Sequence, residues 1–141
     1  MEKSTGELLE ILKSKKNYDE FLKEEIGELL FESLSDYLDT LIKNKGLKKS
    51  EIIEKSNLDR NYAYQIFNGY KKNPSRDKIL MLAFGMKLNL PETEKLLKMA
   101  KLPELYVRDP RDNAIIFCIN KGMTLIEANE NLLDHHIAIL E

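Results

Sequence analysis

The stretch from residue 47 to residue 75 holds the side chains whose types and spacing point most directly to a chemistry. Its middle part, residues 59–68, is predicted to be a helix with a polar outward face made of Arg60, Asn61, Tyr64, Gln65 and Asn68. An arginine can bind guanine through two hydrogen bonds, and asparagine or glutamine can bind adenine in the same way. These side chains therefore predict a helix that reads base edges in the major groove of DNA.

Basic side chains flank this predicted helix and are suited to holding DNA phosphates without reading the sequence: Lys48, Lys49, Lys71, Lys72 and Arg76. Residues 46–78 contain eight basic and four acidic side chains, a net charge of +4 in a chain whose total is −2. A negative total argues against a nucleic-acid-binding protein, because phosphate contacts depend on clustered Lys and Arg. The positive charge nevertheless coincides with the predicted reading helix, where it would steer DNA toward the protein.

The reading helix needs a short helix before it and a tight turn between the two. Asn57 is predicted at that turn, because asparagine tolerates the left-handed backbone conformation better than most side chains. Asp59 can then cap the second helix. The residues predicted to face the interior of the helix pair are Ile52, Ile53, Leu58, Tyr62, Ala63 and Ile66.

Apolar residues at helical spacing predict further helices before this pair, over residues 6–16, 18–30 and 31–45. Ser4 or Thr5 can cap the first of them, and Asn17 can cap the second. Gly27 marks a bend between the second and the third, and Gly46 stops the third.

Helix-starting residues recur in the second half of the chain, at Ser75, Asn89 with Glu92, Asp109 with Pro110, and Thr124 with Glu127. Pro103 is predicted to end the helix that Asn89 begins. The run from Ala114 to Ile119 is apolar on all sides, which predicts either a centrally buried helix or a helix that packs against another chain.

The stretch closes with GYKKNPS, residues 69–75, followed by RDKILMLAFGMKLNL. This ordered pattern resembles the Cro and phage-repressor (XRE-type) helix-turn-helix family over about residues 34–102. The resemblance implies a five-helix domain that binds double-stranded DNA as a homodimer, with half-sites about one DNA turn apart. Ile53 and Ala63 exchange the small and large interior residues that are usual in the family, so the total volume is kept. Phe67 stands where an acidic residue is common.

The sequence thus predicts an all-α protein with three parts. Residues 1–30 form an N-terminal helical extension, residues 31–103 the repressor-like helix-turn-helix domain, and residues 104–141 a C-terminal helix pair. Either terminal part could supply a dimer contact or bind a protein partner.

Other kinds of site are not expected. His135 and His136 are adjacent and point about 100° apart on a helix, so they are predicted to be surface residues rather than metal ligands. Cys118, the one cysteine, is predicted to be a small buried residue and cannot form an intrachain disulfide. The sequence contains no catalytic motif, so we expect neither an enzyme nor a cofactor. No secretory signal or membrane span is predicted, which favours the cytoplasm.

Two functions remain open at this point. The first is a sequence-specific transcriptional regulator, expected to be a repressor, that inserts the helix over residues 59–68 into the major groove. The second is a helical interaction module, such as an antitoxin-like or adaptor subunit, that uses the same fold to bind a protein partner. The acidic ends and low net charge of the chain favour the second.

Overall fold

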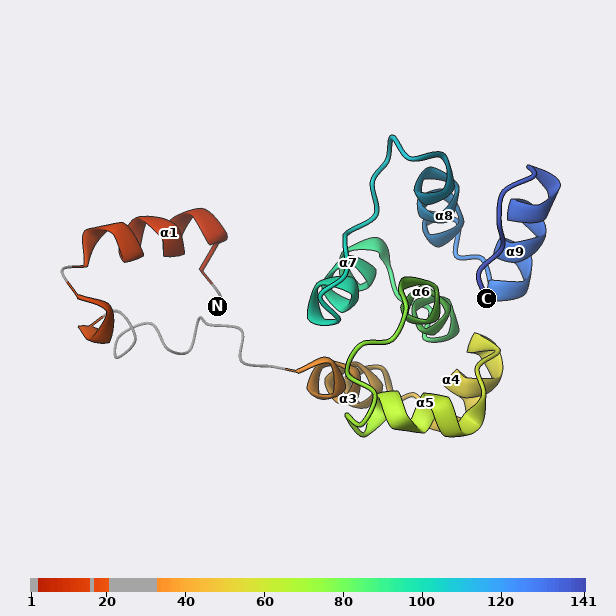
Figure 1. Ribbon diagram of the computed structural model, residues 1–141, viewed down its shortest axis with the longest axis horizontal. Coiled ribbons are helices and arrows are strands. Elements are labelled where there is room, and N and C mark those ends of the chain that lie inside the picture. The colour runs from red at the N-terminus through yellow and green to blue at the C-terminus, as the bar shows by residue number, and fades with distance from the viewer. Residues whose placement is uncertain (1–2, 16, 21–32) are drawn as a thin grey trace. The chain divides into compact units, whose positions relative to one another are not determined.

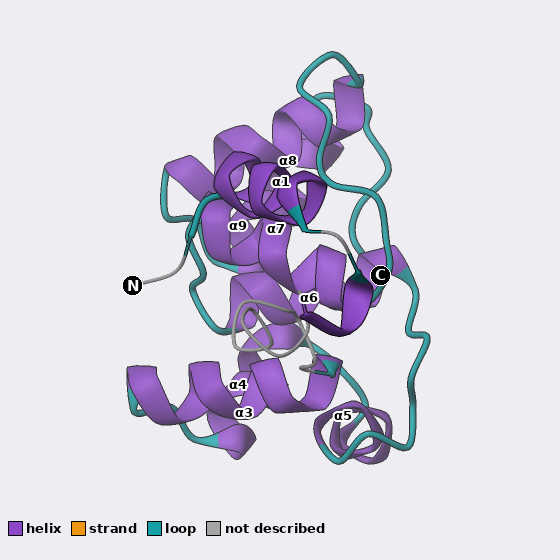
Figure 2. Cartoon of the chain, turned by 90° about the vertical axis from the view of Figure 1, so that its left-hand side faces the viewer, coloured by secondary structure: helices purple, strands orange, loops and turns teal. Residues whose placement is uncertain are grey.

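The computed structural model describes residues 3–15, 17–20 and 33–141. Within these ranges the regular elements are helices and no strand occurs, which confirms the all-α prediction (Figure 2). The chain divides into two compact units, Met1–Phe31 and Glu32–Glu141. Among the described residues, no helix is both long enough and apolar enough to cross a lipid bilayer.

The first unit contains helix α1, Thr5–Ser14. The Ser4 hydroxyl accepts a hydrogen bond from the Glu7 backbone N–H at 3.1 Å, as predicted for an N-cap. Asn17 accepts from the Glu20 N–H at 2.7 Å, and residues 18–20 are helical. The rest of the helix predicted over residues 18–30, including the bend at Gly27, lies outside the described residues.

The second unit contains seven helices within its described part (Figure 1): α3 Leu34–Lys45, α4 Lys49–Ser56, α5 Arg60–Phe67, α6 Arg76–Gly85, α7 Leu90–Met99, α8 Pro110–Asn120 and α9 Leu125–Asp134. The predicted caps at Ser75, Asn89, Asp109 and Thr124 are all present. Helix α3 begins at Leu34 because Ser33 forms a capping box with Asp36. It ends, as predicted, at Gly46, whose φ is +64°.

Helix α6 lies at the centre of this unit, and its residues 79–85 are all buried. It packs against α4, α7 and α9, and Figure 1 shows α7 on one side of it and α9 on the other. The contact with α4 is close at Gly85, because a Cβ atom there would collide with the Ser56 hydroxyl and lie 3.0 Å from the Ile52 carbonyl oxygen. Glycine is therefore required where the two helices cross.

The C-terminal helices join the same hydrophobic core. Ile115 and Cys118 of α8 and Leu132 of α9 are fully buried, and α8 also packs against α7. The apolar run 114–119 is helical as predicted, but it is only partly buried, because Phe117 keeps 48% of its surface exposed.

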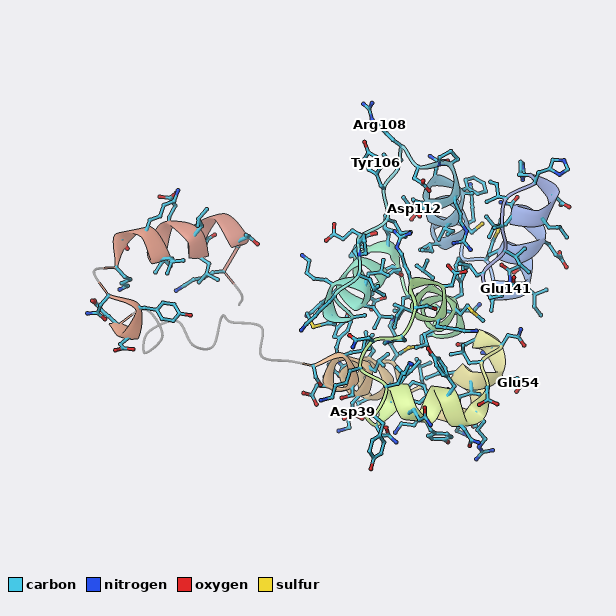
Figure 3. All side chains as sticks on the ribbon, viewed as in Figure 1. Asp39, Glu54, Tyr106, Arg108, Asp112 and Glu141 are labelled. Carbon is cyan, nitrogen blue, oxygen red and sulfur yellow. The ribbon has the colours of Figure 1, made fainter. Side chains whose placement is uncertain are left out.

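Two reciprocal Arg–Asp pairs connect the first turns of α6 and α8. Arg76 donates two hydrogen bonds to Asp112, at 2.8 and 2.9 Å, and Arg111 donates two to Asp77 at the same distances. Each arginine also donates to two backbone carbonyls, Arg76 in the connection after α7 and Arg111 in the C-terminal segment. The pairs therefore hold both irregular segments against the helical core. Figure 3 shows Asp112 at the start of α8, and Tyr106 and Arg108 projecting from the preceding connection.

Candidate nucleic-acid interface

The turn between α4 and α5 has the backbone that the sequence predicts. Asn57 adopts the left-handed conformation with φ of +52°, and its N–H donates to the Glu54 and Ile53 carbonyls. Asp59 then caps α5 by accepting from the Tyr62 N–H at 3.0 Å. Lys48 is the N-cap residue of α4 and makes no side-chain capping bond, because its ammonium group cannot accept a hydrogen bond from the N–H groups of the first turn.

The interior face of the α4–α5 pair agrees closely with the prediction. The side chains of Ile52, Ile53, Leu58, Ala63 and Ile66 are buried, and Tyr62 is half-buried. One further residue, Phe67, is also buried, with 7% of its surface exposed. It lies four residues after Ala63 on the same face of α5, so helical spacing alone could have identified it.

The opposite face of α5 presents polar groups to solvent. Arg60, Asn61 and Gln65 are exposed, and Tyr64 is half-buried. The Tyr64 ring packs edge-on against Phe67, with the two ring centroids 6.1 Å apart, and the Arg60 guanidinium lies 5.6 Å from the Tyr64 centroid. These contacts hold the Arg60 side chain along the helix while leaving its donors accessible.

Asn68 differs from the other predicted reading residues. It is the C-cap of α5, and its side-chain oxygen accepts a hydrogen bond from the Tyr70 N–H at 3.1 Å. The side-chain oxygen of Asn68 therefore takes part in the turn after α5. Gly69 follows with φ of +87° and brings the turn close to Ser35 of α3.

Four lysines predicted to hold phosphates are exposed around α5: Lys48, Lys49, Lys71 and Lys72. The Lys49 ammonium lies 5.8 Å from the centre of the Phe67 ring, and the Lys71 ammonium lies 5.9 Å from that of Tyr62. The Lys71 N–H also donates to the Gln65 carbonyl at 2.9 Å. This bond ties the connection over residues 68–75, here called the basic loop, to the end of α5.

Arg76, the fifth predicted phosphate contact, has a different position. Its guanidinium is directed to Asp112 and to the Pro103 and Glu104 carbonyls, where four hydrogen bonds engage it. The local sequence pattern does not predict the pairing of Arg76 with Asp112, because Asp112 lies 36 residues further along the chain. Arg76 therefore joins α6 to α8, and its guanidinium does not belong to the candidate interface around α5.

Tyr70 is a residue of this face that the sequence prediction did not include. It is 84% exposed and directly follows the turn at Gly69. An exposed aromatic ring between Asn68 and Lys71 adds a large flat surface at the edge of the basic loop.

The histidines and the cysteine lie away from this interface. The Nδ1 atom of His135 is 2.7 Å from the Asn131 carbonyl oxygen, and no group of three potential ligands suited to a metal occurs among the described residues. Cys118 is buried, and burial raises the pKa of its thiol.

Comparison of the chain with protein-family models, with curated proteins and with solved structures gave no match.

Proposed function

We propose that this protein is a sequence-specific DNA-binding transcriptional regulator that places α5 in the major groove, in the manner of a repressor-like five-helix helix-turn-helix domain. The observation that carries the proposal is the division of α5 into two faces. Ala63, Ile66 and Phe67 anchor the helix in the core, while Arg60 and Asn61 extend from its first turn into solvent. The first turn of a recognition helix is the part that contacts base edges in this mode of binding.

The charges around α5 support the same function. Lys48 and Lys49 lie at the start of α4, Lys71 and Lys72 follow the end of α5, and all four are exposed. The Lys49 ammonium lies near Phe67 of α5 and the Lys71 ammonium near Tyr62 of α5. Such groups neutralise phosphates, release counterions and set the register of the helix on the duplex. Binding should consequently weaken steeply as salt increases.

A single α5 offers few base contacts, so selective binding calls for two copies. In this proposal the protein acts as a homodimer whose two reading helices are about 34 Å apart, the spacing of successive major-groove segments. The terminal helical elements would supply the dimer contact.

Fluorescence anisotropy with duplex fragments from the region upstream of the protein's own gene tests this function. The double variant Arg60→Ala, Asn61→Ala should weaken binding to the preferred fragment at least about tenfold, since each bidentate base contact contributes about 1–3 kcal/mol. The matched control is Asn120→Ala, Lys121→Ala, which removes one amide and one cation at the end of α8. Lys121 lies 5.5 Å from the Phe117 ring, much as Arg60 lies beside Tyr64.

The control variant should bind as the unaltered protein does. Binding that does not depend on salt, or that survives the Arg60 and Asn61 substitutions, would contradict the proposal.

A second candidate function, a helical module that binds a protein partner, is favoured by the apolar residues exposed on the C-terminal pair. Phe117, Ile126 and Leu133 are 48%, 72% and 66% exposed, and the last two lie seven residues apart on α9 and so share a face. A stable partner in a pull-down, together with no retention of the protein on duplex DNA, would select this function instead.

A further inference from the structure

A basic cavity lies beside the α5 face, at the start of α3, the loop after α5 and the end of α7. Its volume is about 610 Å³, within the range of cavities that hold small organic ligands. Three lysines line it, Lys71 and Lys72 from the loop and Lys101 from the end of α7. The local sequence pattern does not link Lys101 to the loop lysines, because Lys101 is 29 residues beyond Lys72.

Among the described residues, the charged side chains that line the cavity are all basic. No carboxylate of the described residues lines it, and none of its three lysines forms an ion pair with another described residue. Three lysines around one space give it a positive potential that attracts anions. The natural occupant is therefore an anion with more than one charge.

The start of α3 adds neutral donors to the same wall. Ser33, Leu34 and Ser35 line the cavity, and the capping box already uses the N–H groups of Ser33 and Asp36. The N–H groups of Leu34 and Ser35 belong to the first helical turn, where no carbonyl within the helix is available to accept from them. A phosphate group suits this environment, because it offers several acceptor oxygens to backbone donors and lysines.

Part of the lining is apolar, which distinguishes the cavity from a simple phosphate contact. Leu34, Ile66 and Met99 border it beside the polar Asn73, and of these three apolar residues Met99 is half-buried while Leu34 keeps 7% of its surface exposed and Ile66 none. A phosphate of the DNA backbone would engage the lysines and leave this apolar surface in water. A small molecule with a ring system attached to its phosphate would cover the apolar wall and neutralise the lysines together.

We propose that this cavity binds a small organic phosphate of the nucleotide class, with its phosphate on Lys71, Lys72 and Lys101 and its base against Met99 and the exposed edge of Leu34. Binding of the nucleotide does not depend on the DNA-binding function proposed above. Where DNA does bind, the nucleotide weakens it, because Lys71 and Lys72 are then occupied.

Isothermal titration of the full-length protein with the four ribonucleoside 5′-monophosphates tests the site. At least one should bind with Kd below about 1 mM, and the matching nucleoside and inorganic phosphate should each bind at least about tenfold more weakly. The charge-removing variant Lys72→Gln, Lys101→Gln should lose at least about tenfold in affinity for the same nucleotide.

Lys87→Gln provides the matched control. Lys87 follows α6 much as Lys101 follows α7, both have positive φ, of +53° and +59°, and Lys87 does not line this cavity. The proposal is overturned if none of the four nucleotides binds, if inorganic phosphate binds as tightly as they do, or if Lys87→Gln loses as much affinity as the cavity variant.

A competition experiment separates the two proposals. The nucleotide should displace bound duplex DNA from the unaltered protein, and the single variant Lys101→Gln should lose this effect while still binding DNA. If the protein binds no DNA, the titration still reports on the cavity, so one proposal can fail without the other.

Discussion

At the scale of single side chains, Ile53 of α4 and Ala63 of α5 both face the interior of the protein. Both are buried, with 9% and 0% of their surfaces exposed. The resemblance to the helix-turn-helix family leads one to expect a small residue at the position of Ile53 on α4 and a large one at the position of Ala63 on α5. In this chain the two sizes are exchanged. The exchange is consistent with a core that conserves total volume rather than the size of each residue.

Truncation of Ile53 tests this packing. Ile53→Ala should lower the free energy of unfolding by about 2–4 kcal/mol, because it leaves a cavity that Ala63 is too small to fill. Adding Ala63→Ile should restore much of the loss, and a double-mutant cycle by urea denaturation measures the coupling.

The exposed residue Lys55, also on α4, provides a control, since Lys55→Ala should change the stability by less than about 0.5 kcal/mol. A neutral effect of Ile53→Ala would mean that the two helices are not packed through this residue.

At the scale of elements, α4 packs closely on α6 directly before the turn that leads into α5. Gly85 permits the close approach, and the Ser56 hydroxyl beside it is buried without a hydrogen-bond partner among the described residues. An unpaired buried hydroxyl carries a desolvation cost, and only a small side chain fits at residue 56 opposite Gly85.

Substitutions at this crossing should have opposite effects. Gly85→Ala should destabilise the protein by about 1–3 kcal/mol, because the new methyl group overlaps Ser56 and presses on the Ile52 carbonyl. Ser56→Ala should leave the stability unchanged or raise it, because it removes the unpaired hydroxyl. Thermal unfolding of both variants measures the effects.

Gly6→Ala in α1, where an added Cβ meets nothing within 4 Å, controls for the general effect of alanine in a helix. A stable Gly85→Ala protein would show that the two helices can separate at little cost.

Local chemistry made most element boundaries predictable. Ser75, Asn89, Asp109 and Thr124 each act within three residues of themselves, so the sequence displays their partners directly. The left-handed turn at Asn57 was predictable for the same reason. The spacing of apolar residues predicts a helix that begins at residue 31, whereas α3 begins at Leu34 after its N-cap Ser33. Apolar spacing extends past the cap, so it places the start too early.

Contacts between distant residues were not predictable from the same signals. Arg76 was expected to face DNA, yet its partner Asp112 is 36 residues away and nothing in the local pattern links the two. Lys101 joins Lys71 and Lys72 at one cavity only because α7 ends beside the loop after α5. The helices and their caps can be predicted from a single sequence. The proximity of Arg76 to Asp112, and of Lys101 to the loop lysines, depends on how the helices pack.

The two Arg–Asp pairs connect the core to the C-terminal helices at the scale of the whole molecule. The hydrogen bonds from Arg111 are the largest influence on Asp77 and lower the pKa of its carboxyl. Burial raises the pKa of Asp112, but hydrogen bonds from Arg76 and the Tyr106 N–H outweigh burial, so this pKa is also lowered. Both carboxylates therefore stay ionised in the folded protein at a pH where the unfolded chain begins to take up protons.

The stability of the second unit should consequently fall in acid. A carboxyl with a lowered folded-state pKa contributes its full stabilisation above the unfolded value of about 3.9, and this contribution is lost as the pH falls through the folded pKa. Urea denaturation between about pH 7 and pH 3 should therefore show decreasing stability below about pH 4. The double variant Asp77→Asn, Asp112→Asn should be less stable at neutral pH and less sensitive to acid.

Asp39, in an exposed pair with Lys43, provides the control, because surface ion pairs contribute little. Asp39→Asn should leave both the stability and its pH dependence close to those of the unaltered protein. Equal acid sensitivity in the Asp77, Asp112 variant and the unaltered protein would mean that other groups govern acid unfolding.

Hydroxyl-radical footprinting of the full-length protein on its preferred duplex tests the central claim, DNA reading by α5, most directly. Two copies of α5 in successive major grooves should protect two segments of the DNA backbone about 34 Å apart. This protection should be lost in the Arg60→Ala, Asn61→Ala variant. Absence of protection, or protection spread evenly along any duplex and retained by that variant, would contradict it.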